Sequence, residues 1–252
     1  MIGKMSDFPS TVEIHEEGPR EGFQIEPGPI STVDKVKLID ALSKTGLKHI
    51  QACSFVNPRL VPGWADAEKV VESFDAHEDV EYTGLYFNGN GLNRALAFKD
   101  KLTISGSISL TASEGFTKKN LNRTHAENMA AMERHVMSHL ELGIPVNRIG
   151  VMAAFGCNYQ GDISPATVIK TLEDGMQIAA KTGAEITLFS LADTMGWAAP
   201  HRIERVVGEV RNVWPDMTIS LHLHDTRGLA IANAYSALKK GVRQFDSTAV
   251  SY

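Results

Sequence analysis

Cysteine is scarce in this chain, which has only Cys53 and Cys157 among its 252 residues. Two thiols make neither a disulfide framework nor a cysteine-rich metal site, so a buried or loop thiol is expected at each position. Long apolar runs are missing as well, since no segment approaches the length of a membrane span. The opening Met1–Ser10 also lacks the apolar core of a secretion signal. These absences favour a cytoplasmic protein with no membrane partner.

An excess of basic charge is also absent. The chain has 25 Lys and Arg against 30 Asp and Glu, a net charge of −5. This balance gives no reason to expect nucleic-acid or anionic-membrane binding, although a local basic patch can still hold a phosphorylated ligand. No linker, low-complexity segment or break in composition interrupts the chain. Its length and 43% hydrophobic content suit one large α/β domain, so a single domain is expected over residues 1–252.

Short β-type runs alternate with helical segments from one end of the chain to the other. The candidate strands are Val12–His15, His49–Phe55, Tyr82–Phe87, Leu102–Leu110, Arg148–Phe155, Glu185–Leu191, Thr218–His224 and Gln244–Val250. The candidate helices are Ser31–Ser43, Gly63–Phe74, Leu92–Phe98, Ala126–Leu142, Pro165–Lys181, Pro200–Val213 and Gly228–Lys239. Alternation at this spacing predicts a parallel sheet, and eight repeats favour a closed (β/α)8 barrel, the TIM barrel.

An open doubly wound sheet is the alternative architecture, but no G-x-G-x-x-G motif follows the first strand. The chain ends at Tyr252, where an eighth strand would pass to its loop and covering helix. We therefore expect either further C-terminal sequence or a partner to cover that strand.

The segment Ser220–Asn233, S-L-H-L-H-D-T-R-G-L-A-I-A-N, carries the most informative pattern. His222 and His224 alternate with leucines, so both imidazoles project from one side of the predicted strand, roughly 6–7 Å apart. Two neutral imidazoles at this separation can reach one metal ion. Asp225 and Thr226 break the strand, which puts the pair at its C-terminal end, the catalytic face of a barrel. The alternative is a metal-free pair in the core or on the surface.

Other polar side chains also follow predicted strands. They are Arg20, Glu21 and Gln24 after the first strand, Gln51 and Ser54 after the second, and Ser190 and Asp193 after the sixth. A carboxylate and two imidazoles can hold a divalent cation with positions open for water or substrate. A guanidinium nearby can stabilise a developing oxyanion. Structural roles are the alternatives: Asp193 and Thr194 could cap the next helix, and Arg20 could pair with Glu16 or Glu17.

At several motifs the sequence resembles the 3-hydroxy-3-methylglutaryl-CoA lyases, a family of metal-dependent TIM-barrel carbon–carbon lyases. The resemblance covers essentially the whole chain. Its motifs are Gly18-Pro-Arg-Glu-Gly22, Ser54-Phe-Val-Asn-Pro58, Phe116-Thr-Lys-Lys-Asn120, Gly156-Cys-Asn-Tyr-Gln-Gly161, Asp193-Thr194 and His222-Leu-His-Asp-Thr226.

The resemblance implies a Mg²⁺ or Mn²⁺ site at Glu21, His222 and His224, with Arg20 polarising the thioester oxygen of the substrate. It implies retro-Claisen cleavage of a 3-hydroxyacyl-CoA and leaves a homodimer open. The catalytic candidates are Arg20, His222, Gln51 and Asp193. The candidates for substrate binding are Gln24, Ser54, Ser190, Lys118, Lys119 and Asn120, of which the last three lie in a segment that resembles the family's loop near the CoA. Solvated lysines are the alternative for Lys118 and Lys119.

Three departures from the family pattern bear on activity. The family has Asp where this chain has Glu21, and Glu where it has Gln51, whose neutral amide cannot serve as a base. The family's Gly-rich loop with its catalytic Cys, and a further Asn ligand, follow the eighth strand, beyond Tyr252. Two alternatives to a lyase therefore stay open: a Claisen-type acyltransferase that condenses acetyl-CoA with a 2-oxo acid, and a catalytically weakened homologue that binds CoA or metal.

Overall fold

The structure is a computed structural model that describes residues 8–26, 28 and 30–249. Contacts within the chain divide it into two compact units. Of the described residues, the large unit comprises those within 8–12 and 105–245, and the small unit comprises those within 13–104 and 246–249. The expectation of a single domain over residues 1–252 stays a prediction.

Each of the eight predicted strands has a counterpart among the described residues. They are β1 (Glu13–Glu16), β2 (His49–Ser54), β3 (Glu81–Leu85), β4 (Gly106–Thr111), β5 (Val146–Met152), β6 (Leu188–Ala192), β7 (Thr218–His222) and β8 (Gln244–Ser247). In the small unit the order is β3-β2-β1, and in the large unit it is β8-β7-β6-β5-β4, with the neighbouring strands of each unit parallel. Strand β8 contributes residues to both units. The predicted end of this strand, Val250, lies outside the described residues.

Helices separate the strands along the chain. They are α1 (Gly18–Ile25), α2 (Thr32–Leu42), α3 (Ala67–Ser73), α4 (Gly89–Leu96), α5 (Glu114–Leu121), α6 (His125–Glu141), α7 (Pro165–Thr182), α8 (Pro200–Val213) and α9 (Ala230–Leu238). A 3-10 turn, Pro62–Trp64, precedes α3, so the predicted helix Gly63–Phe74 is in fact two elements. Among the described residues, no helix is long and apolar enough to cross a membrane.

Helices α1 and α5 are absent from the sequence prediction, and the segment Phe116–Asn120, which resembles the family's loop near the CoA, lies in α5. Helix α1 begins with Gly18-Pro19, which favours a turn in sequence, yet proline also suits the first turn of a helix. Helix α5 begins after Ser113, whose Oγ accepts a hydrogen bond from the Phe116 amide at 3.1 Å. It ends at Asn122, which adopts the left-handed conformation at φ 51°. Eight-residue helices of this kind have too few apolar repeats to stand out in a sequence.

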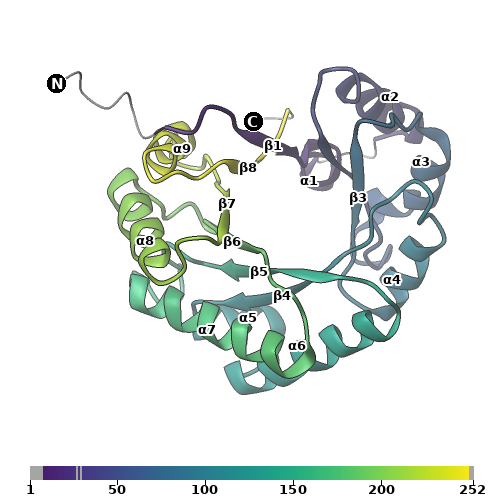
Figure 1. The fold of residues 1–252 in the computed structure, drawn as a ribbon. Coiled ribbons are helices and arrows are strands. Elements are labelled where there is room, and N and C mark those ends of the chain that lie inside the picture. The colour runs from purple at the N-terminus through teal and green to yellow at the C-terminus, as the bar shows by residue number, and fades with distance from the viewer. Residues whose placement is uncertain (1–7, 27, 29, 250–252) are drawn as a thin grey trace. The chain divides into compact units, whose positions relative to one another are not determined.

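In the large unit, α6 and α7 pack against β4 and β5, and α8 lies between α7 and α9 (Figure 1). Ser164 caps α7 through its Oγ, and Gly183 ends that helix in the left-handed region at φ 81°. Gly175 on α7 faces Ile149 so closely that a Cβ atom would lie 2.9 Å from two of its carbons. The absence of a side chain at Gly175 therefore sets how closely α7 approaches β5.

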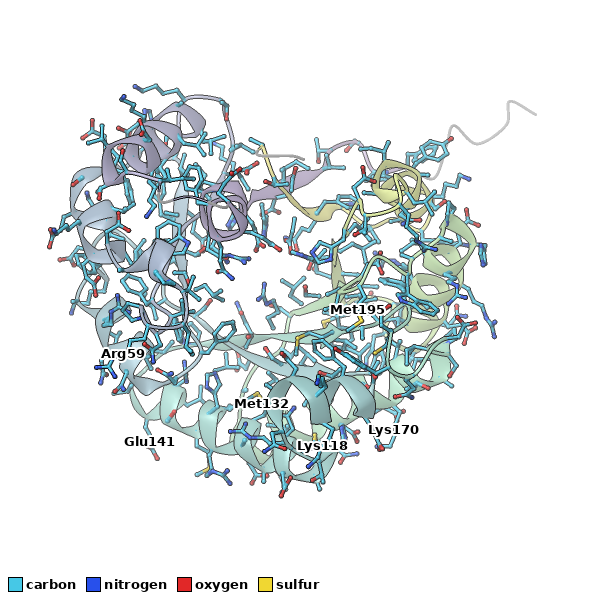
Figure 2. All side chains as sticks on the ribbon, turned by 180° about the vertical axis from the view of Figure 1, so that it is seen from behind. Arg59, Lys118, Met132, Glu141, Lys170 and Met195 are labelled. Carbon is cyan, nitrogen blue, oxygen red and sulfur yellow. The ribbon has the colours of Figure 1, made fainter. Side chains whose placement is uncertain are left out.

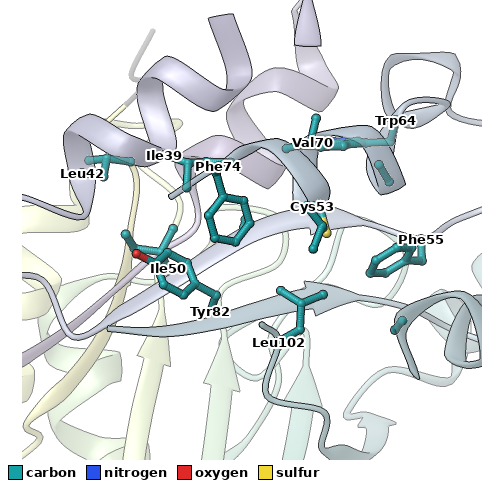
Figure 3. Packing of buried hydrophobic residues seen from close by; sticks show 14 residues of the cluster. Ile39, Leu42, Ile50, Cys53, Phe55, Trp64, Val70, Phe74, Tyr82 and Leu102 are labelled. Atoms are coloured by element: carbon teal, nitrogen blue, oxygen red, sulfur yellow. The ribbon is translucent and has the colours of Figure 1, made fainter. Parts of the chain in front are cut away.

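The small unit has its own apolar core, shown in Figure 3. Residues of α2, β2 and α3 meet there, and the rings of Phe74 and Tyr82 lie 4.8 Å apart. The Tyr82 hydroxyl donates a hydrogen bond to Ser43 Oγ at 2.7 Å, so its polar atom is satisfied inside the core. Lys35 is also buried, with its ammonium 2.6 Å from Asp66. This core fixes β2, whose third residue is Gln51 and whose last residue is Ser54.

Candidate active site

The two histidines of the H-x-H motif converge at the C-terminal end of β7 in the large unit. His222 is the last residue of that strand, and His224 follows it in the loop. Their Nε2 atoms lie 3.3 Å apart, and the rings meet edge to face at 88°. His224 Nδ1 lies 2.9 Å from the Asp193 carbonyl oxygen, which can only accept a hydrogen bond. Nδ1 therefore carries the hydrogen, and Nε2 of the neutral ring is an acceptor or a metal ligand.

Asp193 organises the loop that follows β6. Its amide donates to the His222 carbonyl at 2.8 Å, and its Oδ1 accepts from the amides of Trp197 and Ala198 at 2.7 and 2.9 Å. Burial raises the pKa of the Asp193 carboxyl, and the two amide hydrogen bonds oppose that rise. Oδ2 has no hydrogen-bond partner among the described residues. Asp193 does not cap α8, because the N-cap residue of that helix is Ala199. Asp193 instead fixes the loop that precedes the helix.

A second loop of the large unit, Gly156–Gly161, packs against the loop that contains Asp193. Asn158 Oδ1 accepts a hydrogen bond from Trp197 Nε1 at 2.7 Å. The main-chain nitrogen of Asn158 lies 3.1 Å from the sulfur of Met195, which is labelled in Figure 2. A Cβ atom on Gly156 would lie 2.7 Å from Trp197 Cβ, so this position requires glycine. Cys157 is buried and accepts from the Ser113 hydroxyl at 3.1 Å, as expected of a structural thiol.

In the small unit, Arg20 lies in α1 and is held on several sides. Its Nη2 lies 2.6 Å from Glu17 and 3.2 Å from Glu21, and its Nε donates to Gln51 Oε1. The Trp64 indole donates to the Arg20 carbonyl at 3.1 Å. The structural alternative of a pair between Arg20 and Glu17 is therefore realised, which fixes the guanidinium without excluding a catalytic role. Sequence reasoning missed Trp64, because nothing in the sequence brings residue 64 to α1.

A tight turn connects β1 to α1. Glu16 is buried, and its Oε1 accepts from the amides of Gly18 and Ala249 at 2.7 and 2.9 Å. Burial raises the pKa of this carboxyl, and the two amides oppose the rise. A Cβ atom on residue 18 would collide with Glu16 Oε1, so glycine is needed there. Glu16 thus sets the direction in which α1 carries Arg20 and Glu21 away from β1.

The remaining predicted site residues differ in burial. Ser54 is fully buried, and its hydroxyl has no hydrogen-bond partner among the described residues. Ser190 on β6 is 8% exposed, and Gln24 is exposed at the end of α1. Three predicted site residues of α5 are exposed, with Lys118 labelled in Figure 2: Lys118, Lys119 and Asn120. The substrate contacts of these residues stay predictions.

Comparison with known proteins supplies the decisive observation. The HMGL-like family model matches residues 11–250, almost the whole chain. The chain belongs to the HMGL-like family. A hydroxymethylglutaryl-CoA lyase of Bacillus subtilis is 35% identical over 242 residues, which cover 96% of this chain and 78% of that relative.

Solved relatives of this HMGL-like chain agree with its fold. A hydroxymethylglutaryl-CoA lyase from Pseudomonas aeruginosa matches with a TM-score of 0.85 at 30% identity, covering 96% of this chain and 77% of that one. An HMG-CoA lyase from Acinetobacter baumannii, in complex with coenzyme A and 3-methylmalate, matches with a TM-score of 0.80 at 32% identity, covering 94% and 74%. The prediction of a TIM-barrel α/β fold is confirmed, and so is the resemblance to this family.

The histidine pair meets the geometric requirement for holding a metal ion. Two nitrogens bound to one cation at about 2.0–2.2 Å lie about 3 Å apart or slightly more, close to the 3.3 Å between His222 Nε2 and His224 Nε2. A hydrogen bond from the other ring nitrogen to a main-chain carbonyl, as in His224, is the usual support of a metal-bound imidazole. The residues of the large unit therefore fit the divalent cation that the sequence implies.

Proposed function

We propose that this protein is a divalent-metal-dependent carbon–carbon lyase that cleaves 3-hydroxy-3-methylglutaryl-CoA or a close analogue. One observation carries the proposal: the convergence of His222 Nε2 and His224 Nε2 at 3.3 Å, with His224 oriented by the Asp193 carbonyl. Membership of the HMGL-like family supports it, as does the relative crystallised with coenzyme A and 3-methylmalate.

In this proposal His222 and His224 bind Mg²⁺ or Mn²⁺ together with Glu21. A bound divalent cation supplies Lewis acidity, which lowers the pKa of the substrate's 3-hydroxyl and fixes its geometry. Glu21 is proposed as the third ligand because its carboxylate oxygen would complete a nitrogen–oxygen donor set with the two imidazoles. Its side chain is 31% exposed and lies 3.2 Å from the Arg20 guanidinium.

The reaction itself is a retro-Claisen cleavage in which charge moves from the 3-hydroxyl to the thioester. A base removes the hydroxyl proton, a carbonyl forms at C3, and the C2–C3 bond breaks. The electron pair passes to the thioester enolate, which takes up a proton at C2 to give the shorter acyl-CoA. The proposed base is a water molecule or the ring nitrogen of His222 that does not bind the cation, and the positioned Arg20 guanidinium stabilises the enolate oxygen.

Gln51 and Asp193 complete the proposed set as residues that orient others. Gln51 accepts from Arg20 Nε and so fixes the plane of the guanidinium. Asp193 holds the loop whose carbonyl orients His224. Exposed Lys118, Lys119 and Asn120 are proposed to meet the CoA, and Gln24, Ser54 and Ser190 to bind the acyl group. We also propose a cytoplasmic location, although curated relatives include both cytoplasmic and mitochondrial lyases.

The test is product analysis with purified protein and a single acyl-CoA substrate. A lyase forms acetyl-CoA from 3-hydroxy-3-methylglutaryl-CoA in a reaction that needs Mg²⁺ or Mn²⁺ and stops with a chelator. A Claisen-type acyltransferase instead releases free CoA from acetyl-CoA only when a 2-oxo acid is added. Tight binding of the acyl-CoA with no product under any metal would identify a weakened homologue and contradict the proposal.

A further inference from the structure

A second cluster of metal-ligating side chains lies in the small unit, at the N-terminal ends of its strands. Glu13 and His15 come from β1, His49 opens β2, and Glu81 opens β3. The register pairs His15 with His49, and His49 with Glu81, across three adjacent parallel strands. Because side chains alternate along a strand, Glu13 and His15 project from the same face of β1. The pairing thus brings two imidazoles and two carboxylates into one row.

The distances within this cluster are short. His15 Nε2 and His49 Nε2 lie 3.0 and 2.9 Å from the same oxygen, Glu13 Oε1. The other nitrogen of His49, Nδ1, lies 3.3 Å from Glu81 Oε2. The two rings stack with centroids 4.1 Å apart and planes 24° from parallel. Stacking aims both Nε2 atoms in one direction, toward Glu13.

The geometry of the cluster favours a bound cation. A carboxylate oxygen faces each ring nitrogen of His49, Glu13 at Nε2 and Glu81 at Nδ1. His49 therefore needs a hydrogen at both nitrogens to satisfy both contacts. A cation between Nε2 and Glu13 replaces one proton and leaves Nδ1–H to donate to Glu81. The same cation accepts the lone pair of His15 Nε2.

We propose that Glu13, His15 and His49 bind Zn²⁺, and that Glu81 orients His49 through its Nδ1–H. Zinc takes imidazole nitrogen at about 2.0–2.1 Å and carboxylate oxygen at about 2.0–2.2 Å in tetrahedral geometry. Ligand atoms then lie about 3.2–3.5 Å apart, a few tenths of an ångström wider than the contacts to Glu13. All three ligand atoms lie within 4.8 Å of one another. The fourth position is open to water, since these side chains are 22–39% exposed.

This site is separate from the proposed catalytic residues and does not depend on the proposed function. His49 is the first residue of β2, Gln51 the third and Ser54 the last. In parallel α/β barrels the N-terminal ends of the strands serve stability and the C-terminal ends serve catalysis. The inferred zinc therefore cross-links β1 and β2 and, through Glu81, steadies β3.

The experiment measures Zn²⁺ bound per chain by equilibrium dialysis, with the visible spectrum of Co²⁺ as a second readout. His15→Val together with His49→Val removes both imidazoles with a residue that suits strands. His77→Gln is the matched control, an exposed histidine of the same unit. His222→Ala with His224→Ala separates this site from the proposed catalytic one. Glu13→Gln keeps the side-chain shape in case the valine variant fails to fold.

We expect the His15/His49 variant to bind one Zn²⁺ fewer than the wild type and to lose the tetrahedral Co²⁺ bands. The His77 control and the His222/His224 variant keep this ion. Glu13→Gln should weaken it strongly, and Glu81→Gln by about 10–100-fold, as for other groups that orient a ligand. Unchanged zinc stoichiometry and spectrum in both the valine variant and Glu13→Gln would overturn the inference. So would a wild-type protein whose only zinc disappears with His222 and His224.

Discussion

Two pairs of histidines differ in how their rings are held. One pair lies at the end of β7, and the other joins β1 to β2. His222 and His224 meet edge to face, and a main-chain carbonyl holds the second ring. His15 and His49 stack, and carboxylates hold both. A carbonyl fixes a tautomer without adding charge, so a cation bound beside it keeps its Lewis acidity for substrate. At the other pair a carboxylate takes the place of that carbonyl, since Glu81 lies at the second nitrogen of His49 and adds negative charge beside the proposed ion.

The largest effect is expected when the pair at β7 is removed. His222→Ala with His224→Ala deletes two of the proposed ligands, and the loss of metal catalysis should lower activity by at least about 10³-fold, since the metal contributes several kcal/mol. Mg²⁺ or Mn²⁺ binding by calorimetry should disappear in a protein whose circular dichroism is unchanged. Unaltered metal stoichiometry in this variant would remove the site assignment.

Arg20→Lys tests the proposed role of the guanidinium toward the substrate. The guanidinium contacts Glu17, Glu21 and Gln51 at once, which a lysine ammonium cannot do with the same planar geometry. We expect kcat to fall by about 10²–10³-fold, as when one oxyanion donor is lost, with little change in KM. Steady-state kinetics measure both constants. A change confined to KM would mean that Arg20 contributes to binding alone.

Gln51→Glu tests the departure from the family pattern. The carboxylate keeps the acceptor for Arg20 Nε and adds a charge that can orient or exchange protons. Activity on 3-hydroxy-3-methylglutaryl-CoA should rise by up to about 10²-fold, the lower end of what general acid–base catalysis contributes. The assay belongs in the full-length protein, including any residues that follow Tyr252. An efficient wild type that this substitution leaves unchanged would make Gln51 neutral with respect to specificity.

The smallest effect is expected on stability, at a third histidine pair, His135 and His139 on α6. Burial and the neighbouring His139 lower the pKa of His135 to about 4. Since the unfolded ring binds its proton near pH 6.5, the unfolded state gains protons first, and stability falls as the pH drops from about 6.5 to about 4. His135→Gln should reduce this loss of unfolding free energy by about 1–2 kcal/mol, a range that allows for solvent screening at a half-buried ring. Urea unfolding at pH 7 and pH 4.5 measures it, and an equal loss in both proteins would contradict the assignment.

Much of this organisation is predictable from the sequence because it depends on local patterns. Short β-type runs mark all eight strands, and the H-x-H motif indicates its own strand end. The helices carrying Arg20 and Lys118 are not predictable in this way, because eight residues beginning with glycine or ending at a left-handed Asn122 resemble loops. The cluster at Glu13, His15 and His49 is also invisible in the sequence. It depends on the register between β1 and β2, which no single segment encodes.

Pulsed electron paramagnetic resonance of bound Mn²⁺ tests directly whether His222 and His224 together hold the catalytic cation. We expect hyperfine coupling from two histidine nitrogens in the wild-type protein, the same coupling in the His15→Val/His49→Val variant, and its loss in His222→Ala/His224→Ala. Bound Mn²⁺ with no histidine nitrogen coupling, or a coupling that survives the loss of His222 and His224, would contradict it.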